Sequence, residues 1–352
     1  GDNVVEIEDV LGGDGERTYV VDLGDGDNET TIRFGDGERG RRPATGTRNV
    51  TATYRSGSGS NSVTLDSEVV EPLVSDITID YGDGHGETQG RYKMKFPWDR
   101  SSNSEPGAQV APSQTKVIVF GATGGDVDLE FEVGDRDVDA PETLGVVTAT
   151  GAQVQQTDLA FLHQRAPRPN NDELDDVWEL RTDGFATAGE ASLTVDIPPG
   201  LERLVYLQDA LEVADGATVT VALQGGDGDD DMLAHLIGIS GAGRYEFMAD
   251  GGAGAELLAV LTRDLDIADG AVMAFDLAGG DGDDVLGLRT PAEVAPRTSI
   301  THALTGGTGT DACFTAQDVA VTACERFEPV GDELLSRIET TFGEALADVW
   351  RQ

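Results

Sequence analysis

Short runs of alternating apolar and polar residues dominate the first part of the chain. Residues 18–23, 31–34 and 50–54 alternate in this way between Gly/Asp-rich segments. Successive side chains of a β-strand point to opposite faces, so the pattern predicts strands with one buried face. Glycine supplies the positive φ that tight turns require. We therefore predict an antiparallel β module over residues 1–75, connected by hairpins.

A second β module is expected over residues 76–165. Its clearest strand lies in residues 89–100, where Tyr92, Met94 and Phe96 share one face and Lys93 and Lys95 share the other. We interpret the lysines as a solvated strand face; a docking patch for an acidic partner is the alternative. Residues 166–173 are rich in Pro and Asn, offer nothing to bury, and predict a linker.

Strand-like runs then return at a nearly constant step over residues 174–330. They form three pairs: 204–207 with 219–223, 232–237 with 245–247, and 257–261 with 272–277. An earlier pair, 177–180 with 192–197, fits the same unit with a degraded turn. A unit of about 27 residues suits one coil of a parallel β-solenoid, which buries its apolar face against neighbouring coils. The predicted fold class is all-β, with N-terminal antiparallel β modules followed by a parallel β-solenoid and a C-terminal helix. An antiparallel sandwich with regular hairpins is the alternative.

Residues 331–352 change to a helical period. Apolar residues recur three or four positions apart, at Leu335, Ile338, Phe342, Leu346 and Val349. Asp332 and Glu333 stand in the first turn, where the helix dipole favours acidic side chains. We predict an amphipathic helix that caps the open end of the solenoid, whose strand edges would otherwise be unpaired. An oligomerisation helix is the alternative.

A Gly-rich hexapeptide marks each expected coil. Copies begin at Gly225, Gly251, Gly279 and Gly306, at steps of 26, 28 and 27 residues. The first and third read Gly-Gly-Asp-Gly-Asp-Asp, the second Gly-Gly-Ala-Gly-Ala-Glu, and the fourth Gly-Gly-Thr-Gly-Thr-Asp. Glycines allow a tight turn, and carboxylates offer the oxygen ligands that a hard cation prefers. Each copy is thus either a calcium site or a tight corner with an acidic surface.

The pattern Gly-Gly-x-Gly-x-Asp-x-apolar at residues 225–232 and 279–286 resembles the RTX calcium-binding repeats. The resemblance implies calcium as the cofactor and Asp230 and Asp284 as the main carboxylate ligands. It also implies that Asp227, Asp229, Asp281 and Asp283 assist in binding. Asp311 stands at the main ligand position of the fourth copy, and Glu256 is the acidic residue that the second copy offers there. RTX repeats recur at a much shorter step, so here the stacking partner of each turn would be the next coil.

Two N-terminal segments resemble parts of contractile machinery. Residues 32–63, with Arg-Phe-Gly-Asp-Gly-Glu-Arg-Gly at 33–40 and Asn-Val-Thr-Ala-Thr-Tyr at 49–54, look like baseplate proteins of contractile tails. Residues 89–100, Gln-Gly-Arg-Tyr-Lys-Met-Lys-Phe-Pro-Trp-Asp-Arg, are similar to a β-barrel strand of type VI secretion spike proteins of the VgrG family. In the baseplate proteins the matching segment is structural, so no catalytic residue carries over.

Charge and cysteine content limit the binding partners and the cellular location that we expect. With 66 acidic and 24 basic residues the formal net charge is −42, which repels nucleic acid and suits divalent cations or a halophilic medium. Cys313 and Cys324 predict a disulfide and an extracytosolic location, with two buried thiols as the alternative. No apolar run approaches the roughly 18 residues of a membrane helix, so no membrane span is expected.

We therefore predict a non-enzymatic structural or adhesive protein, extracellular or at a cell, virion or particle surface, and stabilised by calcium. Its partners would be further copies of itself or other proteins of a surface assembly, with glycans as another class. A baseplate, spike or fibre component of a phage tail or contractile injection system is the second hypothesis. A β-solenoid polysaccharide lyase or hydrolase is the third, although no catalytic constellation is apparent in the sequence.

Overall fold

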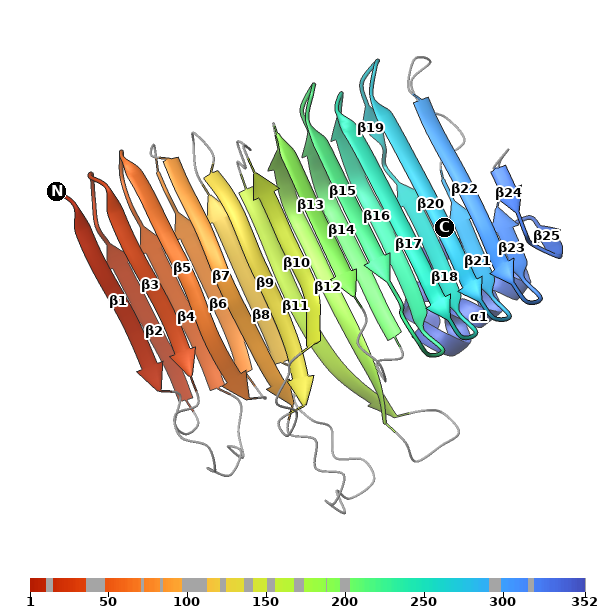
Figure 1. The fold of residues 1–352 in the computed structure, drawn as a ribbon, viewed down its shortest axis with the longest axis horizontal. Helices are drawn as coiled ribbons and strands as arrows, with labels where there is room; N and C mark the ends of the chain where they lie inside the picture. Colours follow the sequence, from red (N-terminus) through yellow and green to blue (C-terminus); the bar gives the residue numbers. More distant parts are fainter. Residues whose placement is uncertain are drawn as a thin grey trace. The chain divides into compact units, whose positions relative to one another are not determined.

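The structure is a computed structural model, which describes residues 1–10, 15–35, 48–70, 73–82, 85–96, 113–120, 125–135, 142–150, 156–167, 174–187, 189–196, 203–290, 299–315 and 320–351. The chain forms two compact units, Gly1–Val195 and Asp196–Gln352. The first unit contains strands only among its described residues (Figure 1). The strands are β1 (Asn3–Val10), β2 (Gly15–Asp22), β3 (Asn28–Gly35), β4 (Arg48–Arg55), β5 (Ser60–Val70), β6 (Leu73–Asp80), β7 (His85–Phe96), β8 (Ser113–Phe120), β9 (Gly125–Asp135), β10 (Glu142–Thr150), β11 (Gln156–Pro167), β12 (Leu174–Thr187) and β13 (Glu190–Asp196).

Successive strands of the first unit alternate between two sheets up to β9. Within this unit the strand orders are β1-β3-β5-β7-β9-β10-β13 and β2-β4-β6-β8-β11-β12. The inner faces bury the apolar members of the alternating runs, namely Ile32, Val50, Ala52, Tyr54, Val63, Leu65, Ile77 and Ile79. The first unit is therefore already a two-sheet solenoid.

The predicted antiparallel pairing of residues 1–75 is wrong. β1 pairs in parallel with β3, and β2 pairs in parallel with β4. The same holds along the series to β8 and β9. The Gly-Asp segment at residues 24–27 connects β2 of one sheet to β3 of the other, so it is not a hairpin. Alternation shows only that one strand face is buried, because side chains alternate between the two faces in parallel and antiparallel strands alike. Antiparallel pairs occur later, where β10 lies between β9 and β13 and β11 lies between β8 and β12.

The expected boundaries also shift. Residue 75 lies inside β6, which pairs with β4 and β8 on both sides of that position. Residues 166 and 167 end β11, residues 168–173 are outside the described ranges, and residues 174–195 belong to the first unit. Residues 89–96 form the second part of β7, between β5 and β9. Residues 36–47, inside the segment 32–63, and residues 97–100, at the end of the segment 89–100, lie outside the described residues.

The second unit is the predicted parallel β-solenoid. Its strands are β14 (Arg203–Val213), β15 (Thr218–Gln224), β16 (Asp231–Gly241), β17 (Arg244–Ala253), β18 (Leu257–Arg263), β19 (Asp266–Ile267), β20 (Val272–Asp281), β21 (Val285–Arg289), β22 (Ser299–Thr308), β23 (Ala312–Thr315), β24 (Ala320–Thr322) and β25 (Arg326–Glu328). One sheet runs β15-β17-β20-β22-β24 and the other β14-β16-β18-β21-β23-β25, with β19 beside β16. Within the described residues of this unit the strands pair in parallel, for example β17 with β20. The all-β solenoid with coils of about 27 residues and a C-terminal helical segment is confirmed.

The C-terminal segment forms two helices, α1 (Asp332–Phe342) and α2 (Glu344–Arg351), separated at Gly343 with φ 97°. They pack on the outer face of the second sheet, where Leu334, Ile338, Ala347 and Trp350 join a core with Leu233, Leu257, Ala259, Leu261, Val285 and Phe314. The predicted cap over the end of the solenoid is therefore wrong. β18 is buried on both faces because these helices cover its outer side, whereas β20 alternates.

Candidate functional site

The Gly-rich hexapeptides of the second unit stack on one another as corners between the two sheets. Gly228 N donates to Ala253 O, and Gly254 N donates to Asp281 O, each at 2.8 Å. The stacked backbones approach so closely that a Cβ on Gly282 would lie 1.3 Å from Gly254 O. A side chain cannot be accommodated there, so glycine is required by both its positive φ and the close approach.

The last acidic residue of each hexapeptide points into the turn, and these residues form a column. Asp230 and Glu256 are each 2% exposed, and Asp284 and Asp311 are each 1% exposed. Glu256 N donates to Asp284 Oδ1 at 3.1 Å, and Asp284 N donates to Asp311 Oδ1 at 3.0 Å. Asp284 and Asp311 thus each accept an N–H from the preceding coil. We call Asp230, Glu256, Asp284 and Asp311 the carboxylate column.

The other four predicted ligands lie outside the column, on the exposed side of the turns. Asp229 Oδ1 accepts a 2.9 Å hydrogen bond from Ala255 N, and Asp283 Oδ1 accepts one of 2.8 Å from Thr310 N. Asp281 Oδ1 accepts from Thr308 Oγ1 at 2.8 Å, and Asp227 forms a backbone bridge with Ala253. These aspartates connect one coil to the next. The structure therefore divides the eight candidates into a buried set and a surface set.

Several column oxygens are buried without a hydrogen-bond partner. They are Oε1 and Oε2 of Glu256, Oδ2 of Asp284 and Oδ2 of Asp311. Burial, the Asp284 side chain beside it and the charges of Asp230 and Asp229 raise the pKa of Glu256 to about 9. Burial and the charges of Asp284, Glu325 and Asp283 also raise the pKa of Asp311, partly opposed by the Asp284 N–H bond. Stacked carboxylates disfavour simultaneous ionisation, so the column binds protons or requires counter-charge.

The column fits an oxygen-coordinated cation in ligand type. Its members lie one coil apart, roughly the 4.8 Å spacing of neighbouring strands, so successive carboxylates lie side by side. Within the described residues, no three His, Cys, Asp or Glu side chains converge as a ready-made metal cluster. Any cation would therefore need ligands besides these carboxylates, and the carbonyls of the glycine turns are of the right chemical type.

The structure adds residues that the sequence did not single out. Glu325 Oε2 accepts a 2.7 Å hydrogen bond from Asp311 N and so extends the column. It follows Asp311 after only 14 residues, so a search at a step of about 27 misses it. In the first unit, Asn3, Asn28 and Asn61 occupy equivalent positions in successive coils. Asn28 and Asn61 follow the same Gly-x-Gly-x spacing, with Asn in place of the acidic residue.

The asparagines form a ladder in which the side-chain amides of successive coils are hydrogen-bonded to one another. Asn3 Nδ2 donates to Asn28 Oδ1 at 2.7 Å, and Asn28 Nδ2 donates to Asn61 Oδ1 at 2.8 Å. Asn28 Nδ2 also donates to Gly26 O at 2.9 Å. In the next coil Gly86 takes this position, and its missing side chain leaves room for the ring of Tyr81. The position that carries a carboxylate in the turns of the second unit thus carries a neutral residue in these turns of the first unit.

Cys313 and Cys324 form a disulfide that joins β23 to the last coil. Cys313 is buried, and in register it pairs with Leu286 of the preceding coil. The two described histidines of the second unit are also structural. Trp350 Nε1 donates to His235 Nε2, and His302 stacks on Phe275 with centroids 5.6 Å apart.

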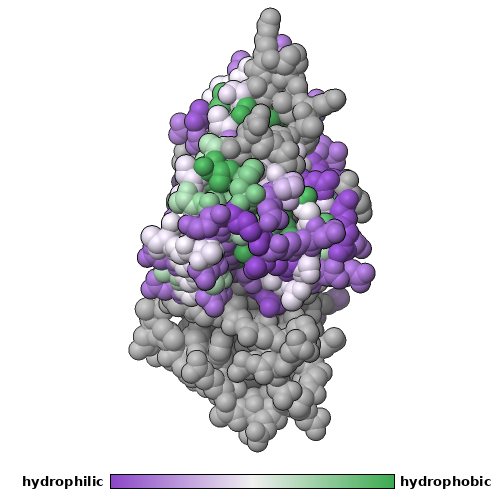
Figure 2. Space-filling model, turned by 90° about the vertical axis from the view of Figure 1, so that its right-hand side faces the viewer, coloured by the Kyte–Doolittle hydropathy of each residue, from purple (hydrophilic) through white to green (hydrophobic). Residues whose placement is uncertain are grey.

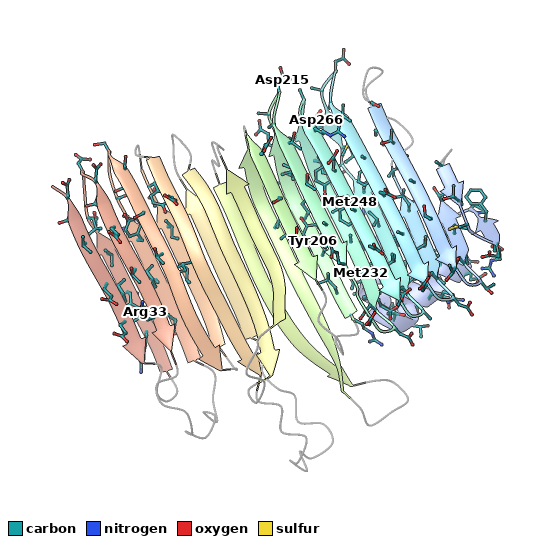
Figure 3. All side chains as sticks on the ribbon, viewed as in Figure 1. Arg33, Tyr206, Asp215, Met232, Met248 and Asp266 are labelled. Atoms are coloured by element: carbon teal, nitrogen blue, oxygen red, sulfur yellow. A yellow bond between two sulfur atoms is a disulfide. The ribbon has the colours of Figure 1, made fainter. Side chains whose placement is uncertain are left out.

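The far ends of the strands carry none of the candidate ligands. Asp215 and Asp266, labelled in Figure 3, lie at the opposite ends of the strands from the stacked hexapeptides.

The scan of family models, the search of curated proteins and the search of solved structures each found no match. Among the described residues, no helix is both long and apolar enough to cross a membrane.

Proposed function

We propose that the protein is a non-enzymatic structural component of an extracellular or particle-surface assembly, and that calcium stabilises its second unit. The observation that carries the proposal is the carboxylate column, with four buried oxygens that lack hydrogen-bond partners. Such oxygens are costly to bury as anions unless a cation or protons neutralise them. Calcium prefers oxygen ligands, and its charge would offset repulsion between coils.

The structural role and its location have separate support. The described strands form regular stacked coils, an architecture that presents extended surfaces. The Cys313–Cys324 disulfide favours an oxidising compartment, which is consistent with export. The net charge of −42 makes the folded chain dependent on screening or bound cations.

The test is thermal unfolding at low ionic strength, with calcium and with chelator. Calcium at about 100 times its dissociation constant would add roughly 2.7 kcal/mol. For a unit of this size that corresponds to a rise in Tm of about 5–10 °C. Glu256→Gln and Asp284→Asn should lose most of this rise, whereas the exposed control Asp266→Asn should keep it. An unchanged Tm of the unaltered protein with and without calcium would sink the calcium proposal.

A further inference from the structure

The last coil of the second unit has open strand edges. β24 pairs with β22 and β25 pairs with β23, and neither has a second strand neighbour among the described residues. The core of α1 and α2 lies on the outer face of the second sheet, against side chains of β16, β18, β21 and β23. Exposed edges of this kind are templates for pairing with another chain.

Phe327 in β25 is exposed although it occupies a position that is buried in the other coils. In register it continues the column of Met232, Leu258, Leu286 and Cys313, which are at most 2% exposed. Phe327 itself is 55% exposed. Figure 2 looks onto this end of the molecule and shows hydrophobic surface beside hydrophilic surface. A further strand beyond β25 would bury the ring as the inner side chains of other coils are buried.

The backbone of β25 is oriented for such pairing. Arg326 N donates to Asp311 O at 3.1 Å, so the peptide groups of Arg326 face β23. Peptide groups alternate in direction along a strand, and those of Phe327 therefore face the open edge. In an antiparallel pair, two facing residues of this kind exchange both N–H···O bonds.

We propose that β25 docks a second copy of this chain, tail to tail, by antiparallel pairing around a two-fold axis at Phe327. This inference rests on the proposed function, since it names the partner of the assembly. In this register Phe327 faces Phe327 of the second copy, and the two exchange hydrogen bonds. Their rings lie in one interior layer, where facing aromatic side chains stabilise antiparallel strands. A two-fold contact is also the commonest interface between identical chains.

The flanking charges fit this register. Arg326 and Glu328 lie on the outer face of β25, one on each side of Phe327. An axis at Phe327 places Arg326 opposite Glu328 of the second copy, and Glu328 opposite Arg326 of the second copy. Within one chain Arg326 already lies 3.1 Å from Glu328 and 2.5 Å from Glu333, so its guanidinium is held at this edge. The sequence Arg-Phe-Glu is therefore self-complementary in the antiparallel sense.

The dimer should be weak and sensitive to salt. β24 and β25 contribute three residues each, so the contact is small compared with stable interfaces. Two chains of charge −42 also repel each other at long range. At about 0.15 M salt the screening length is about 8 Å, which suppresses this repulsion and retains contacts between neighbouring side chains.

Sedimentation equilibrium of the full chain at this ionic strength, from micromolar to low millimolar protein, tests the proposal. The unaltered protein should dimerise. Arg326→Glu and Glu328→Arg should each weaken the dimer about tenfold or more, because two attractive pairs become repulsive. The double variant Arg326→Glu with Glu328→Arg restores opposite charges and should dimerise again. Phe327→Ala should weaken the dimer similarly, whereas Met248→Ala, which removes another exposed apolar side chain, should not.

Near-UV circular dichroism of each variant confirms that the fold is kept. A protein that stays monomeric throughout the concentration range overturns the inference. A dimer that Phe327→Ala and the single charge reversals leave unchanged also overturns it, because the contact then lies elsewhere. Both outcomes are distinct from failure of the calcium proposal, which is read from Tm with and without chelator in the same samples.

Discussion

Trp350 Nε1 donates a 2.9 Å hydrogen bond to His235 Nε2, and the two buried residues are 115 positions apart in the chain. This bond fixes the end of α2 to the middle of β16. Arg289 Nη1 donates to the carbonyl oxygen of Trp350 at the same place. The helices are therefore held on the sheet by specific polar contacts as well as by apolar packing.

Trp350→Phe tests that attachment. The variant keeps an aromatic ring but removes the donor, and it leaves His235 Nε2 buried without its partner. A loss of about 1–3 kcal/mol in the free energy of unfolding is expected, measured by denaturant titration. The exposed helix position Glu344, changed to Ala, should alter stability by less than about 0.5 kcal/mol. Equal stability of Trp350→Phe and the unaltered protein would show that the hydrogen bond contributes nothing.

His235 should make the protein less stable in acid. Burial and, to a lesser extent, the charge of Arg263 lower the pKa of His235 from 6.5 to about 4. The unfolded chain then binds a proton at a higher pH than the folded chain does. The contribution of neutral His235 is complete above pH 6.5 and is lost as the pH falls through about 4. Relative to the unaltered protein, His235→Gln should remove this part of the decline, measured as the difference between their pH–stability profiles.

Glu256 should have the opposite effect in calcium-free buffer. Its folded pKa of about 9 lies above the ordinary value of 4.5, so the folded chain retains the proton to higher pH. Its contribution is complete below pH 4.5 and is lost as the pH rises through about 9. Glu256→Gln should gain stability relative to the unaltered protein between these limits. A parallel pair of profiles, with a constant difference across this range, would contradict the expected raised pKa.

The stacked corners should be far less tolerant of side chains than ordinary turns. Gly282 and Gly270 both have positive φ, but only at Gly282 would a Cβ meet the neighbouring coil. Gly270→Ala should cost about 1–2 kcal/mol from the backbone conformation alone. Gly282→Ala should cost more than about 4 kcal/mol, because two coils must separate. Similar urea midpoints for the two variants would show that the coils yield easily.

Much of the second unit could be predicted from sequence because its pattern is periodic. The step between Gly225, Gly251, Gly279 and Gly306 predicted the length of a coil, and the apolar runs predicted the strands. The continuous apolar run of β18 also indicates that this strand is buried on both faces. Side chains buried on both faces require a layer on each side, and α1 and α2 supply the outer one.

Other features could not be derived from local pattern. Side chains alternate between the two faces in parallel and antiparallel strands alike, so the alternation in residues 1–75 does not predict strand direction. The asparagine ladder lacks the acidic residue that marks the turns of the second unit, so the calcium-binding pattern does not identify it. Whether calcium binds at Asp284 and its neighbours stays a prediction, since residue type alone does not fix coordination.

The contrast between the two columns has a chemical consequence. An amide both donates and accepts, so Asn3, Asn28 and Asn61 complement one another whatever the medium contains. An ionised carboxylate only accepts, so the second unit must draw protons or cations from its surroundings. An amide in place of a carboxylate, repeated along a stack, thus makes the asparagine ladder complete by itself and leaves the carboxylate column dependent on protons or cations.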